Sequence, residues 1–223
     1  MASATTLLLI RHGETEWNAA GRIQGQTNSD LTGLGRRQAE AVAELLHDPG
    51  PLGVWPSRPS VLYSSDLDRT RQTTAPIAER LGLTPRFDPE LREMAFGELE
   101  GLTRTELDAR EPGLLERLFG PGLDPELRPP GGESRADLLV RARRVLDRIA
   151  RDHPGETVAV VSHGGVITMF MRWVVGIDLS RKPDFSALNC SIAAFGHESG
   201  RFRMRAWGLT AAVEAHEVDG DAP

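Results

Sequence analysis

The 223-residue sequence predicts an α/β fold, a three-layer α/β/α sandwich around a mostly parallel central sheet. Three short runs rich in apolar residues, at 6–10, 60–63 and 157–161, are typical of strands buried on both faces. Segments whose apolar residues have helical spacing alternate with these runs along the chain. Alternating strands and helices build parallel sheets with helices on both sides, and binding sites form at the carboxyl ends of such strands.

Capping residues locate the first two helices. Thr32 predicts a helix that runs through about Leu46, because a threonine side chain can accept a hydrogen bond from the first turn. Asp66 predicts the start of a second helix, which runs to Leu81 and stops at Gly82.

Later helices follow from a repeated sequence pattern. The spacing of Thr103 and Glu106, and more loosely that of Ser134 and Asp137, is typical of a capping box at a helix start. A further helix is expected over about 166–175. The segments 191–195 and 201–207 are then expected to form a final pair of strands.

The length and the alternation predict a single domain over residues 1–213, followed by a frayed polar tail at 214–223. Residues from about 93 to 133 are expected to form a lid over the crevice and to set substrate specificity; we call them the lid segment. Its arginines offer contacts to a second anionic group: Arg104, Arg110, Arg117 and Arg128. A homodimer through the C-terminal strands is left open.

Composition excludes several classes of protein. The formal charge is −6, with 32 acidic and 26 basic residues, which argues against a general nucleic-acid binder. The single cysteine, Cys190, excludes a disulfide framework and is expected to be a packing residue. Without a signal-peptide core or a run near the roughly 20 apolar residues of a membrane span, the expectation is a cytoplasmic protein with no membrane association.

Polar clusters follow each of the three predicted strands. They lie at residues 11–13 (Arg-His-Gly), 64–73, which includes Arg69, and 162–164 (Ser-His-Gly). If they converge, two imidazoles and two guanidiniums share one crevice. An imidazole can attack phosphorus, and guanidiniums stabilise the charge on phosphoryl oxygens. The clusters therefore indicate phosphoryl chemistry.

With all three clusters in order, the chain resembles the histidine phosphatase superfamily, also called phosphoglycerate mutase-like, from about Leu7 to Gly176. The resemblance implies a metal-independent phosphomonoesterase that needs no cofactor and acts on a small phosphorylated metabolite. It implies that His12 is the nucleophile and becomes a phosphohistidine, and that Glu93 is the general acid and base. It further implies ligands of the phosphoryl oxygens at Arg11, Arg69 and His163, and pocket-lining residues at Asn18, Gln24 and Gly164. Arg22 and Ser65 are expected to be supporting residues.

Three alternatives remain beside this interpretation. Mutases of the family typically carry Asn-Glu-Arg-His-Tyr-Gly at the acid/base site, whereas residues 92–97 here read Arg-Glu-Met-Ala-Phe-Gly. Mutases also tend to have Gly-Asn-Ser where residues 164–166 read Gly-Gly-Val, so a phosphatase is favoured over a cofactor-dependent phosphoglycerate mutase. The intact histidines and Glu93 argue against a non-catalytic phospho-ligand binder. A metallohydrolase is disfavoured because the spacing fits no recognised zinc motif.

Overall fold

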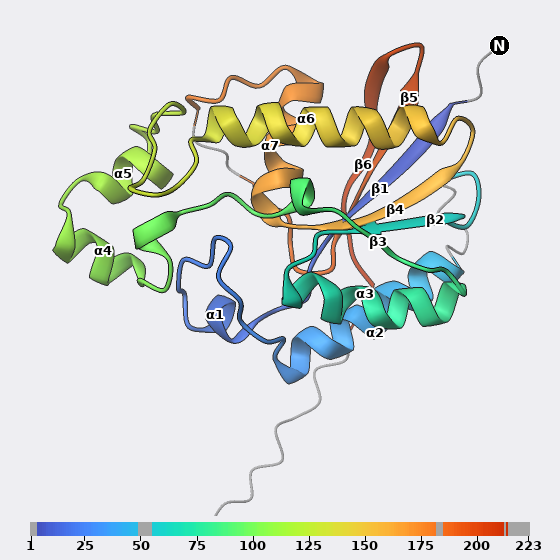
Figure 1. Ribbon diagram of the computed structural model, residues 1–223, viewed down its shortest axis with the longest axis horizontal. Coiled ribbons are helices and arrows are strands. Elements are labelled where there is room, and N and C mark those ends of the chain that lie inside the picture. Colours follow the sequence, from blue (N-terminus) through green and yellow to red (C-terminus); the bar gives the residue numbers. More distant parts are fainter. Residues whose placement is uncertain (1–3, 49–54, 182–184, 212, 214–223) are drawn as a thin grey trace, which may run out of the picture.

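The sheet has the predicted, mostly parallel architecture. The computed structural model describes residues 4–48, 55–181, 185–211 and 213. Within them six strands form one sheet in the order β3-β2-β4-β1-β5-β6 (Figure 1). The parallel strands are β1 (Thr5–Arg11), β2 (Val61–Ser64), β3 (Arg86–Phe87) and β4 (Thr157–Ser162). The antiparallel strands are β5 (Ile192–Glu198) and β6 (Arg201–Leu209).

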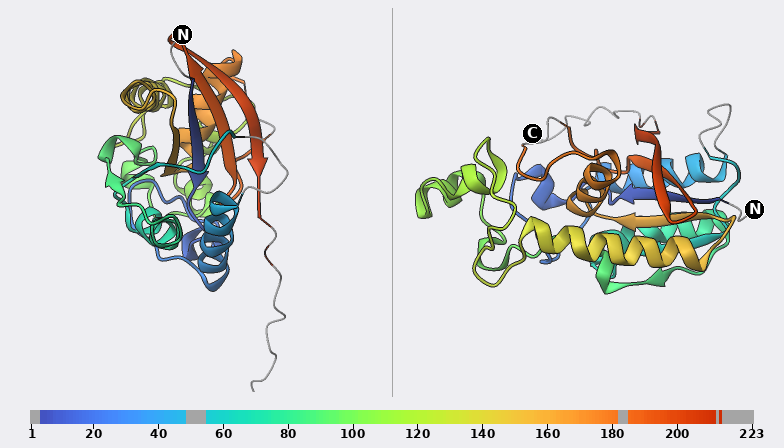
Figure 2. Two further views of the ribbon diagram at one scale, coloured as in Figure 1. Left: turned by 90° about the vertical axis from the view of Figure 1, so that its right-hand side faces the viewer. Right: turned by 90° about the horizontal axis from the view of Figure 1, so that it is seen from above.

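Helices cover both faces of the sheet, which confirms the three-layer prediction (Figure 2). One face packs against α2 (Gly33–His47) and α3 (Asp68–Leu81). The other face packs against α6 (Arg135–Asp152) and α7 (Gly164–Val175). No helix among the residues described has the length and apolar character needed to cross a membrane.

The apolar run of β1 is explained by burial on both sides. Leu7 and Leu9 lie in the core beneath α6 and α7, whereas Leu8 and Ile10 lie in the core beneath α2 and α3. All four side chains are at most 1% exposed. Because successive side chains of a strand point to opposite faces, a strand between two helical layers must be apolar at every position.

Two of the predicted helix starts are confirmed in detail. The side chain of Thr103 accepts from the backbone of Glu106, and the carboxylate of Glu106 accepts from Thr103, at the start of α4 (Arg104–Arg110). The same reciprocal capping box joins Ser134 and Asp137 at the start of α6. In each box two backbone N–H groups without intrahelical partners are satisfied.

The expected start of α3 at Asp66 is wrong. The helix begins after Leu67, which provides no side-chain cap, and the carboxylate of Asp66 instead binds the guanidinium of Arg92 at 2.7 and 2.6 Å. A charge-assisted ion pair with two hydrogen bonds is stronger than a single capping hydrogen bond, so Asp66 pairs with Arg92 instead of capping the helix. The last predicted helix begins at Gly164, two residues earlier than expected.

Several short elements were not predicted. They are α1 (Glu16–Ala19), β3, the 3₁₀ turns η2 (Pro89–Leu91) and η3 (Gly97–Leu99), and α5 (Leu114–Phe119). Elements of two to six residues are too short for apolar periodicity to reveal them.

Within the lid segment, α4 and α5 project from the body of the molecule (Figure 1). The two arms that carry these helices are joined at their base, which we call the neck. There, the N–H of Glu98 donates to Pro130 (3.1 Å) and the N–H of Glu133 donates to Ala95 (2.8 Å). Gly97 has a φ of 56°, and a Cβ there would lie 2.1 Å from the carbonyl oxygen of Pro130. The close contact of the two arms therefore requires glycine. The expected tail at 214–223 lies outside the described residues.

Candidate active site

The register of two parallel strands brings the two predicted histidines together. Arg11 pairs with Ser162 at the carboxyl ends of β1 and β4, so the next residues, His12 and His163, leave the sheet side by side. Their ring centroids are 5.3 Å apart, and both side chains are buried. The sheet topology thus produces the convergence expected from the sequence clusters.

His12 has one ring nitrogen engaged and one free. Its Nδ1 lies 2.8 Å from the carbonyl oxygen of Gly13. A carbonyl oxygen can only accept, so the proton belongs on Nδ1 and the lone pair on Nε2. Burial, reinforced by the charges of Arg11 and Arg69, holds the pKa of His12 well below its usual range, which keeps the ring neutral and nucleophilic near pH 7.

A turn at residues 187–191 holds the end of β1 in place. The side chain of Asn189 donates to the carbonyl oxygen of His12 (2.9 Å), and the N–H of Cys190 donates to that of Arg11 (3.0 Å). Arg11 in turn donates through Nη1 to the carbonyl oxygen of Ala187 (2.7 Å). Asn189 was missed by the sequence analysis, because an asparagine in a loop carries no motif that relates it to a residue 177 positions away.

His163 is oriented by Ser65, the supporting residue expected from the sequence. The Nε2 of His163 lies 2.9 Å from the Ser65 hydroxyl, whereas its buried Nδ1 has no partner among the described residues. If the hydroxyl donates to Nε2, the ring proton is on Nδ1 and is available to an oxygen of a bound phosphoryl group. Burial, followed by the charge of Arg69, holds the pKa of His163 well below its usual range.

Arg69 is fully buried and is clamped by backbone carbonyl groups. Its two terminal nitrogens donate to the carbonyl oxygens of Gly25 (2.6 Å) and Thr27 (3.0 Å). Burial lowers the pKa of Arg69 to about 10, opposed by the nearby charge of Glu93, so the guanidinium remains a cation near neutral pH. Glu100 fixes the same loop by accepting the N–H groups of Gln26 and Thr27.

Several buried polar atoms at this site have no partner among the described residues. They are Nε of Arg11, Nε of Arg69, Nδ1 of His163 and Oε1 of Gln24. The first two are obligatory donors, and the third is a donor when the Ser65 hydroxyl donates to Nε2 of His163. A buried donor left unsatisfied costs about 1–3 kcal/mol, so such donors around His12 indicate a site for an anion that accepts their hydrogen bonds.

Glu93 is anchored at the N-terminus of α7. Its carboxylate accepts the N–H of Met94 at 2.8 Å and that of Gly165 at 3.0 Å. A Cβ at position 165 would lie 2.2 Å from Oε1 of Glu93, so the contact requires glycine there. Burial lowers the pKa of both Arg11 and Arg69, and the charge of Glu93 opposes this lowering in each case, which places the carboxylate near the two guanidiniums.

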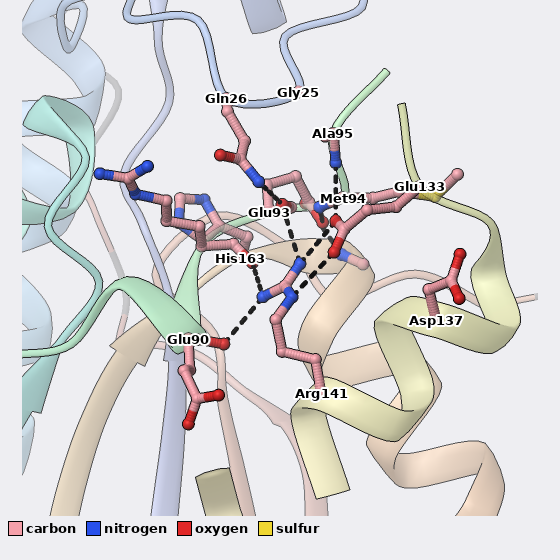
Figure 3. Close-up of polar contacts among 12 residues, drawn as sticks. Gly25, Gln26, Glu90, Glu93, Met94, Ala95, Glu133, Asp137, Arg141 and His163 are labelled. Carbon is pink, nitrogen blue, oxygen red and sulfur yellow. Dashed lines mark hydrogen bonds and ion pairs between the residues drawn. The ribbon is translucent and has the colours of Figure 1, made fainter. Parts of the chain in front are cut away.

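The backbone around Glu93 is held by Arg141 of α6 (Figure 3). Arg141 donates to the carbonyl oxygens of Glu90 (2.8 Å), Arg92 (2.7 Å) and Glu93 (3.2 Å), and it pairs with the carboxylate of Glu133. The side chains of Arg141 and Glu133 are only 14% and 24% exposed. The sequence analysis missed both residues, because a glutamate just before a helix and an arginine within it look like a solvated pair.

A cavity of about 260 Å³ opens over these groups. Six of the eight predicted site residues line it: Arg11, His12, Asn18, Gln24, Arg69 and Glu93. His163 contacts the ring of His12, and Gly164 lines an adjoining cavity. The side-chain oxygen of Asn18 also accepts the N–H of Thr15 in the capping box of α1, so this residue both lines the cavity and stabilises the start of that helix. No group of three or more potential metal ligands occurs in the part of the chain that the structure describes.

A neutral imidazole among unpartnered cationic donors, with a carboxylate beside them, defines a phosphate-handling enzyme of the histidine type. The chain belongs to the histidine phosphatase superfamily (branch 1), whose family model matches residues 7–210.

Similar proteins support the same class. A metal-independent phosphoserine phosphatase of Arabidopsis thaliana is 42% identical over 167 residues, which cover 74% of this chain and 67% of that protein. A solved mycobacterial glucosyl-3-phosphoglycerate phosphatase in complex with VO3 is 33% identical, with a TM-score of 0.80 over 92% of this chain and 99% of that one. A protein of Serratia proteamaculans named "Probable phosphoglycerate mutase GpmB" is 33% identical over 96% of this chain and 95% of that protein. The predicted family and the phosphomonoesterase class are thereby confirmed.

Proposed function

We propose that this chain hydrolyses small phosphate monoesters through a phosphohistidine on Nε2 of His12. The observation that carries the proposal is the set of unpartnered donors on Arg11, Arg69 and His163 around a neutral imidazole whose Nε2 is free. Charge on the phosphoryl oxygens is stabilised by these donors, so positioning and cationic contacts supply most of the catalysis.

The reaction proceeds in two balanced steps. Nε2 of His12 forms a bond to phosphorus while the bond to the ester oxygen breaks, and Glu93 donates a proton to that leaving oxygen. A water molecule then attacks the phosphohistidine, Glu93 takes the proton of that water, and the phosphorus–nitrogen bond breaks to release inorganic phosphate. The position of Glu93 beside both guanidiniums supports this assignment.

Trapping the intermediate tests the nucleophile. Rapid acid-free quenching of the enzyme with a ³²P-labelled monoester is expected to give a label on the protein that is labile to acid and stable to base. The variant His12→Ala is expected to lose both the label and the hydrolysis of p-nitrophenyl phosphate, whereas His47→Ala on α2 serves as a histidine control away from the site. A half-active His12→Ala enzyme would refute the assignment.

A phosphoglycerate mutase is the second candidate, because one of the relatives carries that name. Incubation with 3-phosphoglycerate, with and without 2,3-bisphosphoglycerate, distinguishes the two activities. Release of inorganic phosphate is expected, and substantial isomerisation would overturn the choice. Activity is also expected to survive EDTA, and its loss would favour a metal-dependent reaction.

We expect a cytoplasmic enzyme with a small phosphorylated metabolite as its substrate. A homodimer through β6, which lies at the edge of the sheet, is tested by light scattering at several protein concentrations.

A further inference from the structure

A second cavity, of about 350 Å³, adjoins the phosphate cavity on the side of Glu93. The two cavities share five wall residues: Arg11, Glu93, Phe96, Arg104 and Phe119. The remaining walls come from the start of α7, the start of α6 and residues 185–187. Because Glu93 protonates the leaving oxygen and lies in both walls, a substrate whose phosphorus faces His12 extends its leaving group into the second cavity.

Two arginines of this cavity, Arg104 and Arg135, have no acidic partner among the described residues. The guanidinium carbons of Arg104 and Arg135 lie 5.1 and 5.7 Å from the ring centre of Phe119. Arg135 donates one hydrogen bond, to the carbonyl oxygen of Leu118 (2.7 Å). In the described part of the chain, neither arginine has a carboxylate within 4.0 Å.

The other candidate arginines of the lid segment differ in this respect. Arg110 pairs with Glu98 (3.2 Å), Arg117 with Asp124 (3.3 Å), and Arg128 with Asp137 (2.7 Å). Their charges are therefore already opposed, whereas Arg104 keeps its charge for a ligand. The sequence offered four arginines of the lid segment as contacts to a second anionic group. The structure favours Arg104 among them.

The walls of the second cavity carry an excess of positive charge. They contain the guanidiniums of Arg11, Arg104 and Arg135 against the single carboxylate of Glu93. Arg11 is engaged with the phosphoryl group, so two cations face the leaving group. Burial lowers the pKa of Arg135, with the charge of Arg172 acting in the same direction. An anion between these groups offsets the cost of holding a desolvated cation there.

Apolar surface completes the cavity and limits the charge of its ligand. Phe96 and Phe119 form the shared wall, and the inner wall adds the apolar residues Met94, Leu138, Met169 and Phe185. Desolvating a doubly charged group against such surface costs more than desolvating a single charge. A planar carboxylate, by contrast, matches the fork of a guanidinium.

We propose that the second cavity is a leaving-group subsite in which Arg104 and Arg135 bind one carboxylate, so that the preferred substrates are phosphate monoesters of carboxylic acids. This inference rests on the proposed phosphatase function and names the substrate class of that site. Thr168 and Ser186 line the same cavity, and each carries a hydroxyl group that is able to form a hydrogen bond with the leaving group.

Matched substrates test the subsite. We compare kcat/KM for 3-phosphoglycerate with that for its methyl ester, and for 4-carboxyphenyl phosphate with that for its methyl ester, using p-nitrophenyl phosphate to establish catalysis. The wild-type enzyme is expected to prefer at least one acid over its ester by about tenfold or more, because hydrogen bonds between charged groups discriminate on that scale. Arg104→Gln and Arg135→Gln are expected to bring this ratio close to one, mainly through KM.

Control variants separate binding from folding. Arg110→Gln changes an arginine of the same helix that is already paired, and it is expected to keep the wild-type ratio. Arg135→Lys keeps the charge and is expected to keep part of the preference even if Arg135→Gln folds poorly. A wild-type enzyme that hydrolyses p-nitrophenyl phosphate but shows no preference for either acid would overturn the subsite alone. A preference for the acid that both Arg104→Gln and Arg135→Gln retain would also overturn the subsite. Failure of the wild-type enzyme to hydrolyse any monoester would instead overturn the proposed function itself.

Discussion

The carboxylate of Glu93 and the backbone N–H of Gly165 form a hydrogen bond of 3.0 Å that leaves no room for a side chain at position 165. The bond couples the proposed general acid to the first turn of α7. The N-terminus of a helix favours negative charge, so the Glu93 carboxylate is stabilised there. The bond to Gly165 thereby also fixes where the carboxylate faces the leaving group.

Gly165→Ala is expected to displace Glu93, because the new Cβ would lie 2.2 Å from its Oε1. We expect kcat to fall by roughly 10- to 100-fold for alkyl phosphates, whose poor leaving groups need a proton, and less for p-nitrophenyl phosphate. Glu93→Gln should show the same dependence on the leaving group with a larger loss. Gly33→Ala, at the start of α2, is the matched control, since its Cβ would meet no atom closer than 3.7 Å. Equal loss with every leaving group would contradict a proton-donor role.

The two site histidines are expected to make stability depend on pH. Their pKa values are held well below the ordinary 6.5 in the folded protein, chiefly by burial. As pH falls below 6.5, the unfolded chain binds protons that the folded chain does not, so the free energy of unfolding decreases; above 6.5 the histidines contribute no slope. Urea denaturation between about pH 7.5 and 5 should show this decrease. In His163→Asn the decrease should be smaller, and an identical slope would contradict the prediction.

Arg141→Met is expected to destabilise the protein and impair catalysis. It removes the donors to three backbone carbonyl groups around Glu93 and leaves the half-buried carboxylate of Glu133 without its ion-pair partner, although the N–H of Ala95 still donates to it. We expect a loss on the order of 3 kcal/mol in the free energy of unfolding, together with a lower kcat. Arg144→Met on the same helix is the control: its exposed pair with Glu90 should contribute less than about 1 kcal/mol. Similar losses for the two variants would argue against the buried network.

The thiol of Cys190 is expected to be inert in the folded enzyme. The residue is buried, and burial raises its pKa to about 12, so the reactive thiolate is scarce near neutral pH. Alkylation by iodoacetamide should be slow in buffer and fast in urea, with activity retained during the native incubation. Rapid native modification accompanied by inactivation would show that the thiol is accessible beside Arg11.

Much of the catalytic centre is predictable because it follows buried strands. The parallel strands β1, β2 and β4 are recognisable from their apolar runs, and the residues after them must lie at one edge of the sheet, so Arg11, His12 and His163 could be placed together from sequence. The two-residue strand β3 has no such run. The residues that hold the groups of the site in place could not be predicted in this way. Asn189 and Arg141 act over long sequence separations and resemble ordinary polar residues until the chain is folded.

Predictions from local sequence patterns were also wrong where a tertiary contact competed with the local interaction. Asp66 has the chemistry of a helix cap, yet its carboxylate pairs with Arg92, which is distant in sequence. Short elements such as α5 lack the repeats that reveal periodicity, although α5 carries Phe119, a wall of both cavities. The part of the chain that we expect to set specificity is therefore the part that sequence patterns describe least.

The neck of the lid segment allows α4 and α5 to be exchanged together as one unit. Its arms meet at Gly97 and Pro130 before either helix begins, so the hydrogen bonds of the neck do not involve α4 or α5. The free energy of closing a loop rises only with the logarithm of its length, so insertions and replacements there are tolerated. We therefore expect that exchange of α4 and α5 changes which substrates are bound, while the residues around His12 stay in place.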